Sequence, residues 1–194
     1  TIDYTITVDY DGVLVNDFQN FSIIVSGISI PVSLPYFENW ETENGKKNYS
    51  GKMCYGNSFK WTFDTDDPGK GRVNWGTNAF NTYGGGGALT LDTYPNSTFN
   101  VSNSATLTLN LSDYINSTDL ELSFWWTDHG DEENPGDKVW LRGSINDEWI
   151  EVYDINPTTR INDSYNPSET IDIDQVLLSA NPAQYVSETF QVKF

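Results

Sequence analysis

The stretch 120–153, LELSFWWTDHGDEENPGDKVWLRGSINDEWIEVY, decides the class of fold. Its start, 120–127, places an apolar side chain at every second position, which is typical of a strand with one buried face. The acidic run DHGDEENPGD then interrupts the alternation with glycine and proline, so it predicts a loop. The alternation resumes at Val139 and Leu141, and again over 149–153. The stretch therefore predicts antiparallel strands of a β-sandwich whose long loops hold carboxylates.

Alternation of the same kind elsewhere extends this prediction to an all-β chain. The candidate strands are 58–64, 87–92, 105–111, 120–127, 138–144, 148–154, 169–174 and 187–194. Residues 175–180 predict one short helical turn. The 194 residues are enough for one two-sheet sandwich with a substantial core.

Three segments are expected along the chain. Residues 1–30 alternate apolar and polar side chains, most clearly at 2–10, and predict a β-hairpin. A hairpin is not stable alone, so it is either an added edge hairpin or the terminal strands of a preceding domain. Residues 31–37, PVSLPYF, predict an extended linker because they contain two prolines. The main sandwich is expected over 38–194.

Composition excludes several classes of partner and site. The formal net charge is −18, with only 10 Lys and Arg residues, which argues against binding to nucleic acid or to an anionic membrane surface. No apolar run is long enough to span a bilayer, so no membrane insertion is expected. Cys54 and His129 are the only residues of their types, which excludes an internal disulfide and a Cys/His zinc site.

Clusters of carboxylates in predicted loops suggest structural calcium, because calcium prefers several oxygen ligands at flexible positions. One cluster lies in FDTDDPGKG, a second lies in the acidic loop, and a third surrounds the N-terminal turn near Asp11. None has the spacing of an EF-hand, and a solvated loop is the alternative for each. The candidate ligands of the first two clusters are Asp64, Asp66, Asp67, Asp128, Asp131, Glu132 and Asp137.

No set of catalytic residues stands out. The sequence has no G-x-S-x-G elbow and no phosphate-binding P-loop, and no pair of carboxylates is singled out as the acid and base of a glycosidase. The acidic neighbours of His129 favour its charged form, so it is expected in a salt bridge or turn. We therefore predict that the chain is not an enzyme.

Surplus aromatic residues predict a ligand-binding surface. Trp125, Trp140 and Trp75 lie opposite the aliphatic positions or in loops, where they either stack on sugar rings, dock a protein, or are covered by a loop. Seven Asn-x-Ser/Thr sequons are also present, which would be surface glycosylation sites in an exported protein. They are at Asn20, Asn48, Asn96, Asn100, Asn110, Asn116 and Asn162.

Five segments carry a family resemblance: FENWE at 37–41, GGGGALTLD at 84–92, ATLTLNLSDY at 105–114, the stretch 120–157, and SETFQVKF at 187–194. Together they resemble the MAM-like jelly-roll modules of large secreted bacterial proteins, within the concanavalin-A-like group. The resemblance implies a jelly-roll sandwich over 38–194, with a closing strand expected after Phe194. It also implies Glu38 and Glu41 as calcium ligands, completed by that later segment.

Residues 4–27, YTITVDYDGVLVNDFQNFSIIVSG, resemble the last strands of a prepeptidase C-terminal-type domain, which often follows secreted subtilisin-like proteases. We therefore expect a non-catalytic extracellular or cell-surface module that binds glycan or protein or acts as a spacer, with structural calcium. One alternative is a subunit of a surface fibre or adhesin, assembled when a strand such as 2–10 fills an open sheet edge. The other is the accessory C-terminal region of a secreted protease.

Overall fold

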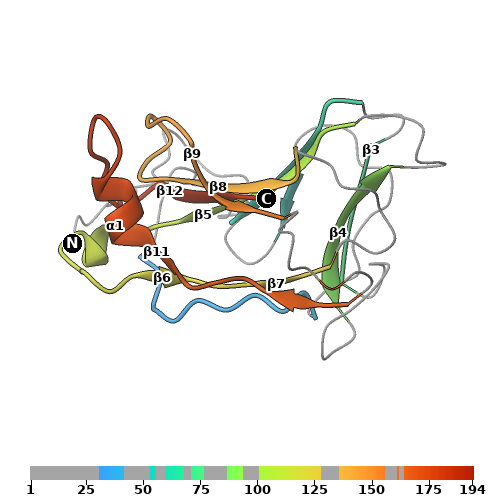
Figure 1. The fold of residues 1–194 in the computed structure, drawn as a ribbon, viewed down its shortest axis with the longest axis horizontal. Helices are drawn as coiled ribbons and strands as arrows, with labels where there is room; N and C mark the ends of the chain where they lie inside the picture. The colour runs from blue at the N-terminus through green and yellow to red at the C-terminus, as the bar shows by residue number, and fades with distance from the viewer. Residues whose placement is uncertain are drawn as a thin grey trace, which may run out of the picture.

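A computed structural model describes residues 31–41, 53–55, 60–67, 71–76, 87–93, 101–127, 136–155, 161 and 164–194, with the backbone alone at 53–55 and 72–76. Figure 1 shows two layers of extended chain with one short helix at one end. The hairpin expected within 1–30 and most of the acidic loop lie outside the described residues.

The main layer is a six-stranded sheet in the order β1-β2-β5-β12-β8-β9, with every neighbouring pair antiparallel. The strands are β1 (Met53–Tyr55), β2 (Trp61–Thr65), β5 (Asn103–Leu109), β12 (Phe190–Lys193), β8 (Lys138–Arg142) and β9 (Ile150–Asp154). The strand last in sequence, β12, lies in the interior of the sheet between β5 and β8. It therefore joins strands from two distant parts of the chain.

The second layer is built from two extended segments that run antiparallel below the main sheet in Figure 1. Strand β6 (Glu121–Leu122) pairs with β11 (Ile171–Asp172), and β7 (Trp125–Trp126) pairs with β10 (Asn166–Pro167). Between these short ladders the register shifts by one residue, because residues 123–124 lie opposite residues 168–170. The amide of Ser168 donates to the Phe124 carbonyl oxygen at 2.8 Å within this irregular stretch. The predicted strand 120–127 is thus one extended segment with two short ladders.

A short helix, α1 (Ile173–Leu178), follows β11 directly. The Asp172 side chain accepts a hydrogen bond from the Gln175 amide at 2.9 Å and so caps the helix. The sequence predicted a helical turn at 175–180, and the cap explains why the helix begins earlier. A 3₁₀ turn, η2 (Ser112–Tyr114), follows β5.

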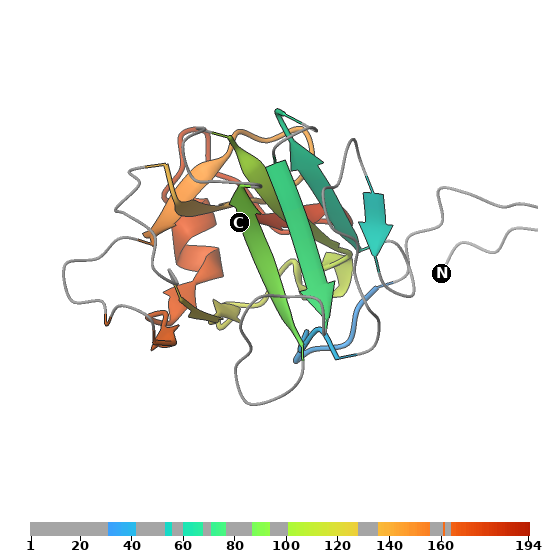
Figure 2. The ribbon, with the colours of Figure 1, turned by 90° about the vertical axis from the view of Figure 1, so that its right-hand side faces the viewer.

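A β-hairpin closes one end of the sandwich. Strands β3 (Gly71–Gly76) and β4 (Ala88–Thr93) pair along their full length, and Figure 2 shows them crossing that end in the foreground. A Cβ on Gly71 would lie 1.8 Å from the Thr65 hydroxyl oxygen and 2.5 Å from Asn103 Oδ1. Only glycine therefore fits where this hairpin meets β2 and β5.

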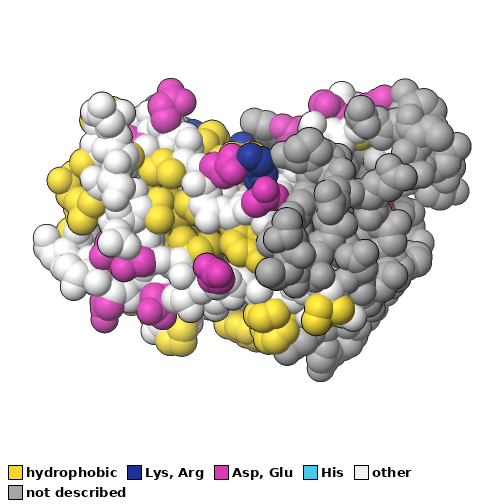
Figure 3. All heavy atoms as spheres, viewed as in Figure 1, with side chains coloured by type: hydrophobic (Ala, Val, Ile, Leu, Met, Phe, Trp, Pro, Cys, Tyr) yellow, Lys and Arg dark blue, Asp and Glu magenta, His cyan; other side chains and the backbone are white. Residues whose placement is uncertain are grey.

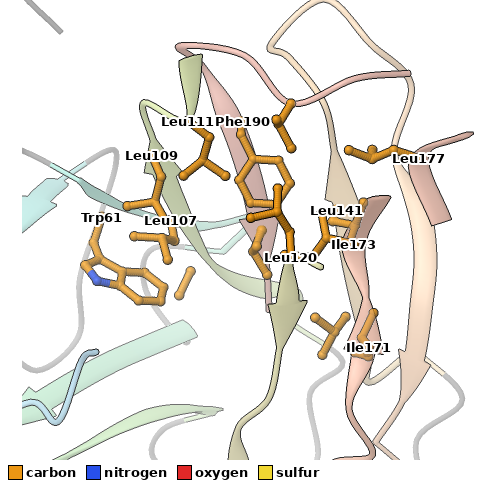
Figure 4. Packing of buried hydrophobic residues seen from close by; sticks show 14 of the residues in the cluster. Trp61, Leu107, Leu109, Leu111, Leu120, Leu141, Ile171, Ile173, Leu177 and Phe190 are labelled. Atoms are coloured by element: carbon orange, nitrogen blue, oxygen red, sulfur yellow. The ribbon is translucent and has the colours of Figure 1, made fainter. Parts of the chain in front are cut away.

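The core lies between the two layers. In Figure 4, Leu120 of the second layer and Ile173 at the start of α1 face Phe190 and Leu141 of the main sheet. Alternation accounts for this packing, because every second residue of β5, β8 and β12 and most of β2 points inward. The most deeply buried large side chains are Phe63, Val139, Leu141, Leu177, Phe190 and Val192.

The segment 31–41, which includes the expected linker, packs along the sandwich. The amide of Val32 donates to the Asn110 carbonyl oxygen at 3.0 Å. The Trp40 ring lies 4.7 Å from the Trp61 ring, centroid to centroid. Trp40 has a left-handed φ of 62°, and its amide is held by the Glu38 carboxylate at 3.1 Å. Contacts with the core thus begin before residue 38.

The all-β prediction is confirmed, and each predicted strand from 58 onward overlaps an observed one. Strands β1, β3 and β10 were not predicted, because their sequences are short or rich in glycine, asparagine and proline. In the described part of the chain, no helix is long and apolar enough to cross a membrane.

Leu141→Ala tests the position of the core. Leu141 is 0% exposed, so its truncation should lower the free energy of unfolding by about 2–5 kcal/mol. Ile145→Ala is the control, because Ile145 is 50% exposed and its loss should change that free energy by no more than about 0.5 kcal/mol. Urea denaturation measures both. Equal effects of the two substitutions would contradict the described packing.

Candidate functional site

The outer face of the main sheet carries aromatic and cationic side chains from β8, β12 and Trp149, the residue before β9. Val139 and Leu141 point into the core at 0% exposure, so Trp140 and Arg142 point outward. In β12, Val192 is buried and Lys193 points outward by the same alternation. We call this surface the Trp–cation face, defined by Trp140, Arg142, Trp149, Gln191 and Lys193.

Strand register brings these residues together. Gln191 is paired with Arg142, and Lys193 is paired with Trp140. The Lys193 ammonium lies 4.6 Å from the Trp140 ring centroid and 4.4 Å from the Trp149 centroid. The Arg142 guanidinium carbon lies 4.2 Å from the Trp149 centroid. Both cations thus sit within cation–π range of half-buried indole rings.

Hydrogen bonds hold the arginine in place. Arg142 Nε donates to Gln191 Oε1 at 2.8 Å, and Nη2 donates to the same oxygen. Arg142 Nη1 donates to the Asp147 carbonyl oxygen at 3.3 Å. Gln191 Nε2 donates to the Thr108 hydroxyl oxygen at 2.8 Å. The guanidinium is therefore oriented from two strands and one turn, which limits its motion before any ligand binds.

Threonines continue the face across the sheet. Lys193 is paired with Thr106 on β5, and Thr106 is paired with Thr62 on β2. Adjacent strands are about 4.8 Å apart, so the row from Trp140 through Lys193 to Thr62 spans about 14 Å. All four side chains of this row are half-buried. The row presents one indole ring, one ammonium group and two hydroxyl groups on four neighbouring strands.

The two cations of the face lack a carboxylate partner among the described residues. In contrast, Lys138 on the same sheet forms an ion pair with Glu151 at 2.7 Å. Burial lowers the pKa of Lys193, and repulsion from Arg142 lowers it further. Burial also lowers the pKa of Arg142, although Asp147 and Glu148 oppose this shift. The Trp–cation face is thus a local concentration of positive charge on a chain of formal net charge −18.

Only Trp140 of this face was predicted as a ligand-binding residue. Trp149 and Arg142 had a usable signal, because in the segment VWLRGSINDEW two tryptophans flank a short turn and Arg142 shares the strand phase of Trp140. Gln191 and Lys193 had none, because their pairing with β8 joins parts of the chain that are distant in sequence.

Of the other two predicted tryptophans, Trp125 lies away from this face. Trp125 is 49% exposed on β7 in the second layer. Its neighbour Trp126 points inward, where its indole nitrogen donates to the Tyr153 hydroxyl at 3.1 Å. Trp75 lies on β3, opposite Leu89, and its side chain lies outside the described atoms.

The predicted calcium ligands that the structure describes are spread over separate places. Asp64 accepts the Thr65 amide at 3.0 Å, and Asp66 accepts the Ser102 amide at 2.9 Å, so both carboxylates hold the end of β2. Asp67 follows them and accepts the Gly71 amide with its carbonyl oxygen at 2.7 Å. These hydrogen bonds indicate that the Asp64 and Asp66 carboxylates and the Asp67 carbonyl oxygen stabilise the chain where β2 ends.

The carboxylates of the FENWE segment also bind backbone amides. Glu38 accepts the Trp40 amide, and Glu41 Oε1 accepts the Gly87 amide at 2.8 Å. A Cβ on Gly87 would lie 2.2 Å from the Trp40 carbonyl oxygen, so glycine is required for this close approach. Glu41 thus fastens the start of the sandwich to the chain before β4, whereas Glu38 stabilises the local turn at Trp40.

Asp137 precedes β8, and its carbonyl oxygen accepts the Ile155 amide at 2.9 Å. It lies at the same end of the sheet as Asp66, but β5 and β12 separate their strands by about 14 Å. Asp128, Asp131 and Glu132 lie outside the described residues. Among the residues that are described, no group of three or more His, Cys, Asp or Glu side chains is placed to hold a metal ion.

Two sequons fall in the described chain. Asn116 is exposed after η2. Asn110 is 7% exposed, and its Oδ1 accepts the Ser112 amide at 3.1 Å and the Ser112 hydroxyl at 2.7 Å. A glycan at Asn110 would require this side chain to leave its buried position. Asn20, Asn48, Asn96, Asn100 and Asn162 lie outside the described residues.

A shallow groove of about 320 Å³ lies between β9 and α1. Figure 3 shows hydrophobic side chains gathered in the middle of this side of the molecule. The Glu151 carboxylate at its rim is ion-paired with Lys138. The groove is lined by Ile150, Glu151, Gln175, Val176, Ser179 and Ala180.

Comparisons with family models, with curated proteins and with solved structures found no match to this chain. The functional interpretation therefore depends on the geometry of its own residues.

The pKa of Lys193 tests the described environment of the face. We expect NMR titration of the lysine side chains to place the pKa of Lys193 below the ordinary lysine value, because of its burial. The pKa of Lys138 should lie above that value, because Glu151 accepts a hydrogen bond from Lys138. The folded pKa of Lys193 lies below its unfolded value, so stability should rise with pH between the two values and be lost as pH falls through the folded one.

Arg142→Met should raise the pKa of Lys193 by removing the repulsion, while burial still keeps it below the ordinary value. A Lys193 midpoint at or above that of Lys138 in the unsubstituted protein would contradict the described face.

Calcium binding stays a prediction that thermal melting can test. If only the folded chain binds calcium, a concentration of 100 times Kd should stabilise it by about 2.7 kcal/mol. The melting temperature in calcium should then exceed that in EDTA, with magnesium as the control cation. Equal melting temperatures in calcium and in EDTA would rule out a stabilising site.

Proposed function

We propose that the chain is a non-catalytic binding module of a secreted or cell-surface protein, and that it holds a glycan on the Trp–cation face. The observation that supports this most is the pair Trp140 and Trp149, held beside each other by the Lys193 ammonium. The solvent-accessible part of these half-buried indole rings suits the apolar faces of sugar rings, which are otherwise surrounded by hydroxyls.

The polar residues of the face suit the same ligand. Thr106, Thr108 and Gln191 supply donors and acceptors on a flat sheet surface, next to the tryptophans. Few polar groups at defined positions beside an aromatic surface are what a binding site needs for specificity. Arg142 and Lys193 bind and orient, and the proposal gives them no step of bond making or breaking.

Localisation follows from the proposal and from the sequons. A glycan-binding module acts where glycans are exposed, which favours the cell surface or the extracellular space. Asn116 is an exposed acceptor position of the kind that exported proteins use.

Strand donation between copies, as in a surface fibre, stays a prediction. The groove beside β9 offers a place for an added strand. However, Val139 is paired with Tyr153 while Trp140 is paired with Glu151, so Val152 forms a bulge in this edge strand. Bulges in edge strands disfavour further pairing. We therefore give glycan binding precedence.

The tryptophan substitutions test the proposed face. Trp140→Ala and Trp149→Ala should each weaken glycan binding about two- to tenfold, because an aromatic contact contributes about 0.5–1.5 kcal/mol. Trp125→Ala is the matched control, since Trp125 is an exposed tryptophan on the other layer. Affinity electrophoresis against a polysaccharide panel, followed by calorimetry on any hit, measures the effect.

Loss of binding in Trp125→Ala alone would move the site to the second layer. Undiminished binding by both Trp140→Ala and Trp149→Ala would exclude the Trp–cation face. A protein ligand would be indicated if partner binding, and not glycan binding, depended on Trp140 and Trp149.

A further inference from the structure

The Trp–cation face carries positive charge, whereas the chain as a whole is strongly acidic. The protein has 28 Asp and Glu residues against 10 Lys and Arg residues. Even so, Arg142 and Lys193 lie together on one face, and no described carboxylate lies within ion-pair distance of either one. The described carboxylates nearest to Arg142 in sequence, Asp147 and Glu148, act on it only through space.

Two features of this arrangement disfavour the charged forms of Arg142 and Lys193. Arg142 and Lys193 repel each other, and partial burial weakens the hydration of both. The indole rings of Trp140 and Trp149 offset part of this cost by cation–π attraction. An anion that accepts hydrogen bonds from these cations would offset more of it, because hydrogen bonds between charged partners are the stronger ones.

Donors for such an anion are present. Nη1 and Nη2 of Arg142 each use one hydrogen in the bonds to Asp147 and Gln191, and each retains another. The described partners of the Lys193 ammonium are aromatic rings, so its N–H groups remain available to an oxygen acceptor. Carboxylates and sulfates both present oxygens that fit a guanidinium and an ammonium together.

The formal net charge of −18 restricts the ligand further. A densely charged polyanion would be repelled by the whole molecule. At physiological ionic strength, charges more than about 8 Å apart are largely screened, so most of the acidic residues act only weakly on a single acidic group near the face. Such a group interacts with Arg142 and Lys193 and with the nearby carboxylates Asp147 and Glu148, which act on Arg142. The face therefore suits a ligand that is mostly neutral and carries acidic groups at intervals.

We propose that the glycan bound on the Trp–cation face carries sparse acidic groups, and that Arg142 and Lys193 bind one of these groups while Trp140 and Trp149 contact the neighbouring sugar rings. This inference rests on the proposed glycan-binding function and names its ligand class.

The experiment compares matched ligands that differ only in the acidic group. A xylan with sparse glucuronic acid, the same xylan after chemical reduction of its carboxyl groups, and the reduced xylan after light sulfation are tested against the full chain. An equivalent set is prepared on a galactan backbone. Binding to the carboxylated or the sulfated form should be about tenfold tighter than to the reduced form, and their order distinguishes a carboxylate from a sulfate ligand.

Variants assign the effect to the face. Lys193→Met retains the side-chain length without the charge and should remove the preference for the acidic form, while Lys193→Arg should keep it. Lys60→Met is the matched control, because it changes the net charge equally and Lys60 lies over the Tyr36 ring instead, 4.5 Å from its centroid. Its preference for the acidic form should be unchanged.

A measurement on the unsubstituted protein does not depend on how the variants fold. The side-chain NMR signal of Lys193 should shift when the acidic xylan or galactan is added, and it should not shift comparably with the reduced form. Equal shifts with the two forms would overturn the inference.

The outcomes separate the two proposals. Equal, tryptophan-dependent binding to the acidic and reduced forms would overturn the acidic preference and leave glycan binding supported. A preference for acid that survives Lys193→Met would overturn the role of the face. Binding to none of the ligands would count against both proposals.

Discussion

The antiparallel pairing of β12 with β8 is the interaction on which the rest of the structure depends. It places Val192 beside Leu141 on the core side, where both are almost fully buried. The same register places Lys193 beside Trp140 on the outer side. A slip of one residue would exchange the two faces, exposing the aliphatic side chains and burying the cation. Burial of the core therefore determines the position of the Trp–cation face.

The face combines attraction and repulsion in a small area. Trp149 lies close to both cations, and Gln191 holds Arg142 by two hydrogen bonds. These contacts keep the charges of Arg142 and Lys193 on the same face, although neither residue forms an ion pair with a described carboxylate. Elsewhere the chain uses its carboxylates for local structure, as Asp172 does at α1 and Glu41 does at Gly87. These carboxylates thus have structural partners, whereas the two cations of the face do not pair with a described carboxylate. For this reason we interpret the face as a binding surface and not as an ordinary charged surface of a sheet.

Sequence patterns predicted where the strands lie better than they predicted which strands pair with one another. The alternation in 120–127 indicated which side chains point inward, and Leu120 and Trp126 are indeed buried. The strands β1 and β3 were missed because MCY and GRVNWG have weak strand signals of their own and form strands through their neighbours. Of the predicted ligand-binding residues, Trp140 lies on the proposed face. The assignment of Trp125 to the other layer required knowledge of which segment pairs with 166–173.

The amino-acid sequence by itself determined the all-β class, the inward and outward phase of most strands, and the acidic character of the chain, because these depend on local periodicity and composition. Tertiary structure alone decided that Lys193 meets Trp140 and Trp149, and that Glu41 reaches Gly87. Such contacts depend on which distant strands become neighbours, and that choice is made by packing of the whole core, where many registers compete and one buries the apolar side chains best.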